Sequence, residues 1–217
     1  IMGSTYLKFK GLTIKNRKQD AATRIVYQIN AGNAGTEQNG NLYFDQIVSS
    51  GSGGCGFWAW YYDTLYVTNC DSYNHCDSLD MGGHLGGFGN GFSLAAKGNP
   101  TDLYKYTEVS GCRTWKTSAD GIAVSTTKQM YVHNNWVFLG GYKYDGDGDG
   151  IKFLFSYDQS PSHRMIYNNL VAFIQHDAFS DNNLTDVTYG PCGAYYNNTV
   201  YRAEKGFTSY PEDCFYK

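Results

Sequence analysis

Asn134-Asn135-Trp136-Val137-Phe138 returns as Asn168-Asn169-Leu170-Val171-Ala172 and again as Asn197-Asn198-Thr199-Val200-Tyr201. Further upstream the same line reads Gly111-Cys112-Arg113-Thr114-Trp115, Asn69-Cys70-Asp71-Ser72-Tyr73, Asp45-Gln46-Ile47-Val48 and Gly11-Leu12-Thr13-Ile14. The line is a short apolar strand opened by Gly, Asn, Asp or Cys. Its shortest spacings fit one bare coil of a solenoid, and its longer spacings fit the same coil with an inserted loop.

A second line alternates with the first along the whole chain: a small or polar residue, usually Gly, and then a large apolar one. It reads Gly56-Phe57-Trp58, Asn90-Gly91-Phe92, Asp120-Gly121-Ile122, Asp149-Gly150-Ile151, Asp177-Ala178-Phe179 and Lys205-Gly206-Phe207. Gly permits positive φ at tight corners, Asn tolerates the left-handed region, and stacked Asn amides can bond along an axis. The pattern predicts an all-β, right-handed parallel β-helix of about seven coils.

An antiparallel sandwich or barrel also has many short strands and Gly-rich turns. That alternative requires two-residue hairpin loops at regular intervals, and the Asn39-Gly40 and Asn90-Gly91 pairs do not separate strands evenly. We therefore expect one β-helix domain over residues 1–217. Because the first strand begins almost at Ile1, without the polar cap that a solenoid needs, we expect the chain to be a fragment of a longer one whose N-terminal cap is missing.

Composition excludes two classes of partner. The formal net charge is −3 and the sequence pI is about 5.9, so no basic surface indicates nucleic acid binding. No apolar run reaches the roughly 20 residues of a membrane span. With 26 glycines, 20 tyrosines and only four prolines, the composition is that of a β protein.

Cysteines and glycosylation acceptors indicate a secreted, extracellular protein. The even number of cysteines suits disulfides in an oxidising compartment. Cys192 and Cys214 flank the last coil and are expected to close it. The other four are expected to pair among themselves: Cys55, Cys70, Cys76 and Cys112. The acceptors for glycosylation are Asn183 and Asn197.

Several stretches of the sequence resemble those of one known family. They are Asn69–Asp77, Asn90–Lys97, Gly111–Trp115, Asp120-Gly121, Asp145–Lys152, His163-Arg164, Tyr167–Asn169, Ala172-Phe173 and Ala178–Asn183. The family they resemble is the family-nine polysaccharide lyases, which are pectate lyases with a parallel β-helix of ten coils. The resemblance runs from about Gly11 to Phe207.

The resemblance implies β-elimination on a uronate polymer such as pectate. A neutral lysine removes the proton at C5, and a calcium ion held by aspartates neutralises the substrate carboxylate. The family's lysine corresponds to Lys152. Its first calcium aspartate falls on Asn90, and of its Asp-Asp-Gly-x-Asp group only Asp120 remains acidic here. An amide oxygen and one carboxylate make a weakened calcium site.

An acidic run before Lys152 is a second candidate for the ion. Asp145, Asp147 and Asp149 alternate with glycines, which resembles a calcium loop, although no bidentate Glu follows at the EF-hand position. The alternative is a flexible acidic turn. Lysine works as a base only when unprotonated, so we expect any lyase activity to need a divalent metal and an alkaline pH.

Other side chains could bind the polymer. Arg113, His163 and Arg164 are cations near coil corners that could recognise uronate carboxylates, and surface pairing with acidic residues is the alternative. The aromatic run Phe57–Tyr62 could stack on pyranose rings, although strand alternation places half of it in the core.

The sequence leaves three functions open. The first is a secreted lyase for an acidic polysaccharide with Lys152 as base. The second is a non-catalytic β-helix that binds glycan or assembles with other extracellular chains, favoured by the lost calcium carboxylates. The third is a β-helix glycoside hydrolase, which would need two carboxylates such as Asp120 and Asp149 facing each other across a groove.

Overall fold

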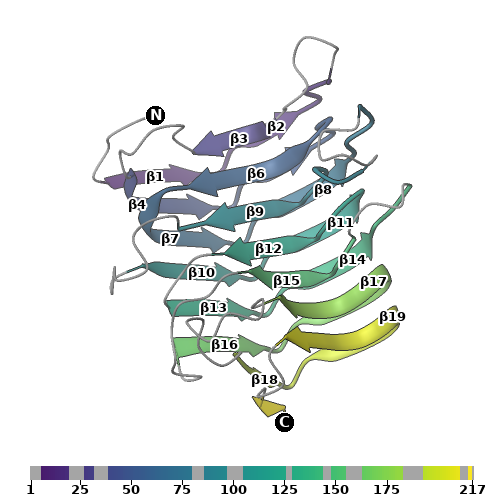
Figure 1. Cartoon of the computed structure of the whole chain (residues 1–217). Coiled ribbons are helices and arrows are strands. Elements are labelled where there is room, and N and C mark those ends of the chain that lie inside the picture. The colour runs from purple at the N-terminus through teal and green to yellow at the C-terminus, as the bar shows by residue number, and fades with distance from the viewer. Residues whose placement is uncertain are drawn as a thin grey trace.

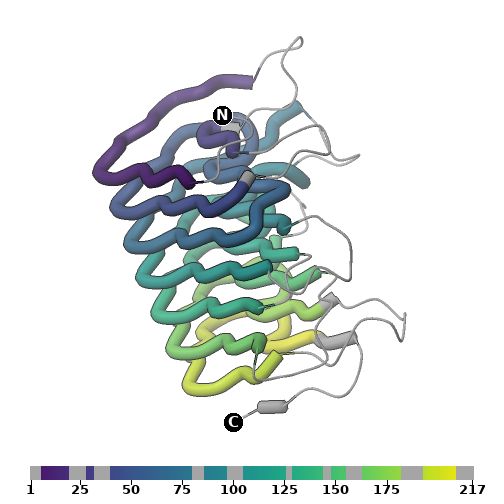
Figure 2. Tube along the Cα trace, turned by 90° about the vertical axis from the view of Figure 1, so that its left-hand side faces the viewer, coloured from purple at the N-terminus to yellow at the C-terminus, as the bar shows by residue number. Residues whose placement is uncertain are grey.

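The computed structural model is a solenoid of parallel strands wound around one axis (Figures 1 and 2). It describes residues 6–19, 27–31, 39–79, 86–96, 105–125, 129–143, 148–154, 163–182, 193–210 and 215–216. Every strand pair in these ranges is parallel, and each strand pairs with strands of the coils before and after it. The antiparallel sandwich or barrel is therefore excluded, and the predicted parallel β-helix is confirmed.

One side of the solenoid is an eight-stranded sheet. Its strands are, in spatial order, β1 (Tyr6–Lys10), β4 (Asn39–Asp45), β7 (Tyr62–Thr68), β10 (Tyr106–Ser110), β13 (Gln129–His133), β16 (Arg164–Tyr167), β18 (Ala194–Tyr196) and β20 (Phe215–Tyr216).

The other sheet has two arms that share their last strands. The first arm holds β2 (Thr13–Lys15), β5 (Val48–Ser50), β8 (Asp71–His75), β11 (Arg113–Thr117) and β14 (Trp136–Gly140). The second arm holds β3 (Tyr27–Ala31), β6 (Cys55–Trp60), β9 (Phe92–Ala95), β12 (Ile122–Ser125) and β15 (Ile151–Leu154). The long strands β17 (Leu170–Asn182) and β19 (Thr199–Tyr210) run through both arms, with a register irregularity between Ile174 and Asp177.

Two rows of left-handed residues turn the chain at successive corners. The corner between the first sheet and the first arm uses Gly11, Gln46, Asn69, Gly111, Asn134, Asn168 and Asn197, with φ between 53° and 70°. The bend after the first arm uses Asn16, Gly51, Asn74, Lys116, Leu139, Phe173 and Arg202. The first Asn of each Asn-Asn pair is thus the corner residue, as the repeat predicted.

The second Asn of each pair points inward and forms a ladder along the axis. The backbone N–H groups of Cys112, Asn135 and Asn169 donate to the side-chain oxygens of Asn135, Asn169 and Asn198 at 2.9, 3.1 and 3.0 Å. The Asn135 and Asn169 amides donate in turn to backbone carbonyls, at 2.9 Å in both cases. This satisfies buried backbone groups that no strand partner reaches.

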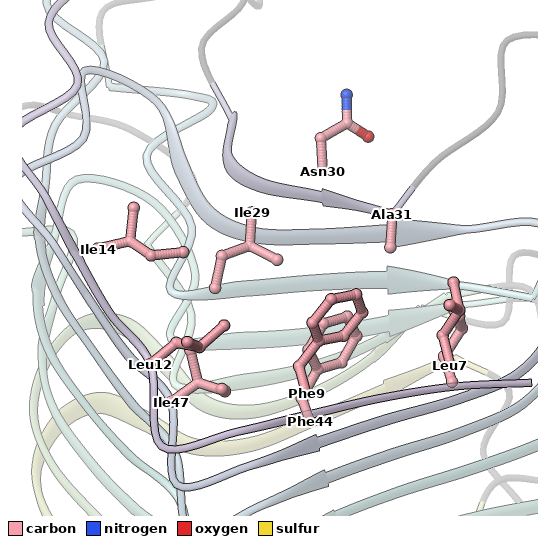
Figure 3. A pocket seen from close by; sticks show the side chains of 10 residues that line it. Leu7, Phe9, Leu12, Ile14, Ile29, Asn30, Ala31, Phe44 and Ile47 are labelled. Carbon is pink, nitrogen blue, oxygen red and sulfur yellow. The ribbon is translucent and has the colours of Figure 1, made fainter. Parts of the chain in front are cut away.

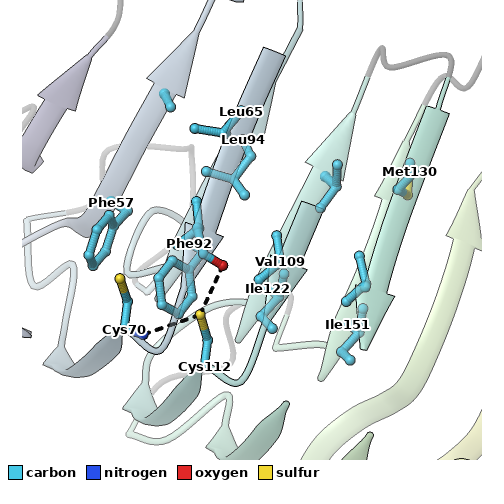
Figure 4. Close-up of a cluster of buried hydrophobic side chains, with 14 of the residues drawn as sticks. Phe57, Leu65, Cys70, Phe92, Leu94, Val109, Cys112, Ile122, Met130 and Ile151 are labelled. Atoms are coloured by element: carbon cyan, nitrogen blue, oxygen red, sulfur yellow. Dashed lines mark hydrogen bonds between the residues drawn. The ribbon is translucent and has the colours of Figure 1, made fainter. Parts of the chain in front are cut away.

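Cysteines continue this ladder toward the N-terminus (Figure 4). The sulfur of Cys112 accepts from the backbone N–H of Cys70 at 3.5 Å, and the sulfur of Cys70 accepts from that of Ile47 at 3.4 Å. The disulfides expected among Cys55, Cys70, Cys76 and Cys112 are not formed, because all four are free thiols. Cys192 and Cys214 lie outside the described residues.

The interior is filled by side chains that stack from coil to coil (Figure 4). Phe57, Phe92, Ile122 and Ile151 occupy one such row on β6, β9, β12 and β15, and the rings of the first two are 4.7 Å apart. An apolar pocket of about 160 Å³ lies among β1, β2, β3 and β4 (Figure 3). Its lining is apolar except for Asn30, so it continues the core and offers no chemistry.

Glycines of the second line are needed for close approach of the chain to itself. A Cβ atom on Gly121 would lie 2.3 Å from Val137 Cγ1 and 2.7 Å from the carbonyl oxygen of Gly150. One on Gly150 would lie 2.4 Å from Val171 Cγ1. Neither glycine has positive φ, so the reason expected from the sequence, left-handed backbone, applies to the Gly11 and Gly111 corners and not here.

Among the described residues, no helix is long and apolar enough to cross a membrane.

Candidate active site

A second ladder precedes the strands of the second arm. The backbone N–H of Asp120 donates to Asn90 Oδ1 at 2.9 Å, that of Asp149 donates to Asp120 Oδ1 at 3.1 Å, and that of Asp177 donates to Asp149 Oδ1 at 3.2 Å. Each of Asn90, Asp120 and Asp149 directly precedes one of the glycines at which the coils approach closely. Three residues proposed as metal ligands from the sequence, Asn90, Asp120 and Asp149, are thus brought together as hydrogen-bond acceptors.

Lys152 lies next to this acidic ladder. Its neighbours on β15, Ile151 and Phe153, point into the core, so Lys152 is on the outward row, as alternation predicted. Its Nζ is 3.2 Å from Asp149 Oδ2 and 4.0 Å from Asp120 Oδ1. The residue is only 4% exposed, a burial that the strand pattern did not reveal.

The electrostatics of this cluster favour a charged lysine. Asp120 and Asp149 are 7% and 3% exposed, so their charges are poorly screened by water. A buried cation is retained when carboxylates pair with it, and removal of either partner leaves an uncompensated charge. The Lys152 amine therefore lies between two carboxylates that favour its ammonium form, of which Asp149 is the nearer.

The described residues do not form a calcium site on their own. No group of three His, Cys, Asp or Glu side chains converges on one point in the part of the chain that the structure describes. Asp120 and Asp149 each use one oxygen as a ladder acceptor, and the other oxygen of Asp149 contacts Lys152. Asp145 and Asp147 lie outside the described residues, so the predicted calcium loop stays a prediction.

A glycosidase pair is not supported by this arrangement. Asp120 and Asp149 are consecutive rungs of one ladder and share Lys152, rather than facing each other across a substrate. Two carboxylates of a glycoside hydrolase must flank the scissile bond.

The three predicted substrate-binding cations do not join Lys152. Arg113 lies on the first arm, where Nε and Nη2 bind Asp71 at 2.8 and 2.6 Å, and this carboxylate raises the pKa of the guanidinium. His163 precedes β16, on the opposite sheet. The sequence-based role of Arg164 is not supported, because its side chain is 1% exposed inside the solenoid, where a polymer cannot reach it.

Asp181 also faces the interior, near Arg164. Burial raises the pKa of Asp181, while the charge of Arg164 and hydrogen bonds from Tyr195 and Gly193 lower it. This cluster closes the core with polar groups near its C-terminal end and takes no part in the candidate site.

The aromatic run Phe57–Tyr62 divides between the two faces of its strands. Phe57 and Tyr62 are buried, while Trp58 and Trp60 point outward and stack on each other with ring centroids 4.1 Å apart. Trp58 lies in the same outward row as Lys152, separated from it by Ser93 and Ala123 on β9 and β12. The sequence had named this run but could not assign its members to a face.

His75 has a structural role that the sequence pattern did not separate from the roles of the other histidines. Its Nδ1 accepts from the backbone N–H of Ser52 at 3.2 Å, and its Nε2 lies 3.0 Å from Ser72 Oγ. Burial lowers the pKa of His75 to about 3. The ring is therefore neutral, with its proton on Nε2.

Asn197, one of the two predicted glycosylation acceptors, is exposed at a corner with φ 54°. Asn183 lies outside the described residues. An accessible side chain is required for glycosylation, so the prediction stands for Asn197.

No family model and no curated protein matches the chain. Among solved structures, it is similar to the crystal structure of pectate lyase Pel9A, with a TM-score of 0.62 and 16% sequence identity. The similarity covers 96% of this chain and 52% of that one, so the chain spans about half the length of the lyase structure. At this identity the comparison shows the fold: the chain is a parallel β-helix like that of a pectate lyase.

Proposed function

We propose that the chain is a secreted lyase that cleaves an acidic, uronate-containing polysaccharide with Lys152 as the base. The observation that carries the proposal is the buried Lys152 on the outward row of the second arm, 3.2 Å from Asp149. Lysines are rarely buried without a functional or pairing reason. The pectate-lyase-like fold and the family resemblance of the sequence support the choice of substrate.

β-Elimination requires Lys152 to accept one proton from the substrate. Its neutral amine takes the proton from C5 of the uronate, and the electron pair left behind forms the C4–C5 double bond. The bond from C4 to the glycosidic oxygen breaks, and that oxygen takes up a proton from water. The reaction therefore yields one unsaturated uronate end for each cleaved bond.

The resting cluster stabilises the protonated form of Lys152. Two carboxylates within 4.0 Å favour the ammonium, so the amine needed for catalysis forms as the pH rises. We expect the rate of elimination to increase toward alkaline pH.

Calcium remains a prediction from the sequence. Among the described residues, Asn90, Asp120 and Asp149 do not make a calcium site by themselves. One oxygen of each carboxylate already accepts a backbone N–H, and calcium takes six to eight oxygen ligands.

A second candidate function is glycan binding without cleavage, and the same ion pair favours it. Lys152 held as an ammonium by Asp149 and Asp120 could bind a uronate carboxylate but could not remove a proton. Such a protein would bind acidic polysaccharide or assemble with other extracellular chains.

One assay separates the two functions. The protein is incubated with polygalacturonate across pH 7 to 10, with and without added calcium, and unsaturated uronate ends are followed by ultraviolet absorbance. Product formation supports the lyase. Binding of the polymer in affinity electrophoresis without product under every condition supports the binding protein and contradicts the lyase.

A further inference from the structure

A surface on the first arm combines exposed aromatic rings with two arginines. We define this aromatic–arginine face by the residues Arg113, Trp136, Phe138, Phe173, Tyr201 and Arg202 on β11, β14, β17 and β19. Trp136, Tyr201 and Phe173 are 53%, 51% and 43% exposed. Large rings this accessible mark a binding surface when they are contiguous.

Strand register places these rings on one outward surface, where they form two pairs. Trp136 and Phe138 alternate with the buried Val137 on β14, so both point outward. In register, Phe138 is followed by Ala172 on β17 and then by Tyr201 on β19. The small Ala172 leaves the two rings on either side of it separated by two strand spacings, about 10 Å.

The rings of this face are arranged differently from the stacked pairs elsewhere on the solenoid. In the eight-stranded sheet Tyr43 stacks on Tyr66 at 10°, and earlier on the first arm Tyr73 stacks on Trp115 at 5°, so each ring covers the next. On the aromatic–arginine face, Trp136 meets Phe138 at 76° and Phe173 meets Tyr201 at 80°. Edge-to-face pairs leave a ring face open to a ligand, and an open face is what the apolar side of a pyranose ring packs against.

Two guanidinium groups flank these rings. Arg113 is in register with Trp136, and its side chain is 57% exposed while it binds Asp71. The Arg202 guanidinium lies 5.2 Å from the ring centre of Tyr201 and 5.7 Å from that of Phe173. A guanidinium stacked on rings keeps its edge for a carboxylate, and Arg binds carboxylates through two parallel hydrogen bonds. Arg113 is paired with the carboxylate of Asp71, and Glu204, two residues after Arg202 on β19, is exposed.

We propose that the aromatic–arginine face is a second binding site for the acidic polysaccharide, separate from Lys152. Its rings would take pyranose faces and Arg202 would take a uronate carboxylate, whereas Arg113 already binds Asp71. The choice of polymer rests on the proposed function, but binding here does not depend on cleavage. The face belongs to the first arm, whereas Lys152 belongs to the second, so the two sites are on different sides of the solenoid (Figures 1 and 2).

The test measures binding in a Lys152→Ala background, in which the polymer stays intact. Polygalacturonate and a neutral galactan of similar length are the two probes, each in affinity electrophoresis. Trp136→Ala and Tyr201→Ala are expected to weaken binding of polygalacturonate about tenfold each. Arg202→Gln is expected to weaken it less and to reduce its dependence on salt. Tyr66→Ala is the matched control, because its ring stacks on Tyr43 in the other sheet, and it should bind within about twofold of the parent.

The outcomes are distinguishable from those of the lyase assay. Unchanged binding by Trp136→Ala and Tyr201→Ala, or equal binding of galactan, would overturn the inference. It is also overturned if light scattering shows that the parent self-associates through this face and Trp136→Ala dissociates it. Binding that depends on Trp136 in a protein that never cleaves polygalacturonate would support this site while the lyase proposal fails.

Discussion

Nζ of Lys152 lies 3.2 Å from Oδ2 of Asp149, and the other oxygen of that carboxylate accepts the backbone N–H of Asp177 in the next coil. One side chain therefore does two things. It accepts a backbone hydrogen bond from the next coil, and its charge favours the protonated form of the lysine. The charge next to Lys152 and the stability of the solenoid are therefore coupled through Asp149.

Replacement of Asp149 by Asn separates these two roles. The amide oxygen of Asn can still accept the N–H of Asp177, while the negative charge next to Lys152 is lost. We expect the fold to persist and the rising limb of the pH–rate profile to move toward lower pH, because the ammonium loses its nearer partner. An unchanged profile measured with polygalacturonate would show that Asp149 does not control the base.

The asparagine ladder is expected to make a large contribution to stability. Asn169 accepts from the backbone N–H of Asn135 and donates to the carbonyl oxygen of Val132, in the interior. Asn169→Ala leaves both groups without their partner and should lower the free energy of unfolding by about 3 kcal/mol. Asn168→Gly, at the exposed corner with φ 55°, is the control and should change it by less than about 1 kcal/mol. Urea unfolding curves measure both, and equal losses would argue against the ladder.

Acid should destabilise the protein through His75. Its pKa is about 3 in the folded state and about 6.5 in an unfolded chain, so folding favours the neutral ring. The stability contributed by this preference is complete above pH 6.5 and is lost as the pH falls from 6.5 toward 3. We expect the slope of unfolding free energy against pH between 6.5 and 5 to be smaller in His75→Gln than in the parent. Parallel slopes would mean that other groups cause the acid sensitivity.

Chelation is expected to leave the thermal midpoint unchanged to within about 1 °C. Ligand binding to the folded state raises the midpoint, and the described carboxylates are engaged by backbone N–H groups and Lys152 instead of a metal. Differential scanning calorimetry with and without a chelator tests this. A fall of several degrees, reversed by calcium and absent in Asp149→Asn, would place an ion at the acidic ladder.

Much of the fold followed from local sequence. The repeated Asn residues predicted left-handed bends because Asn tolerates positive φ, and they indicated amides stacked along the axis. Which Asn of each pair takes which role came from the structure. The same logic applied to Cys70 and Cys112, which stand at ladder positions. They were expected to form disulfides because pairing was inferred from the number of cysteines, whereas the structure uses their sulfur atoms as acceptors of backbone N–H groups.

The candidate site was only partly predictable. Alternation with Ile151 and Phe153 gave the direction of Lys152, but its burial depends on residues distant in the sequence. Alternation could also have corrected Arg164, since it shares a face with the buried Ile166 on β16. Lys152 and Asp149 flank Gly150, where a Cβ atom would lie 2.4 Å from Val171 Cγ1 one coil away, a close approach that local sequence does not reveal.

The central claim is that Lys152 is the base of an elimination reaction. The most direct measurement is the initial rate of unsaturated uronate formation from polygalacturonate by the parent, Lys152→Ala and Lys152→Arg, at the parent's optimal pH. Circular dichroism confirms in each case that the β-helix is intact, and Lys152→Arg keeps the charge between Asp120 and Asp149. The account predicts a measurable rate for the parent and a loss of at least about a hundredfold in both variants, the scale of a removed general base. A Lys152→Ala protein that is folded and cleaves at the parent's rate would contradict it.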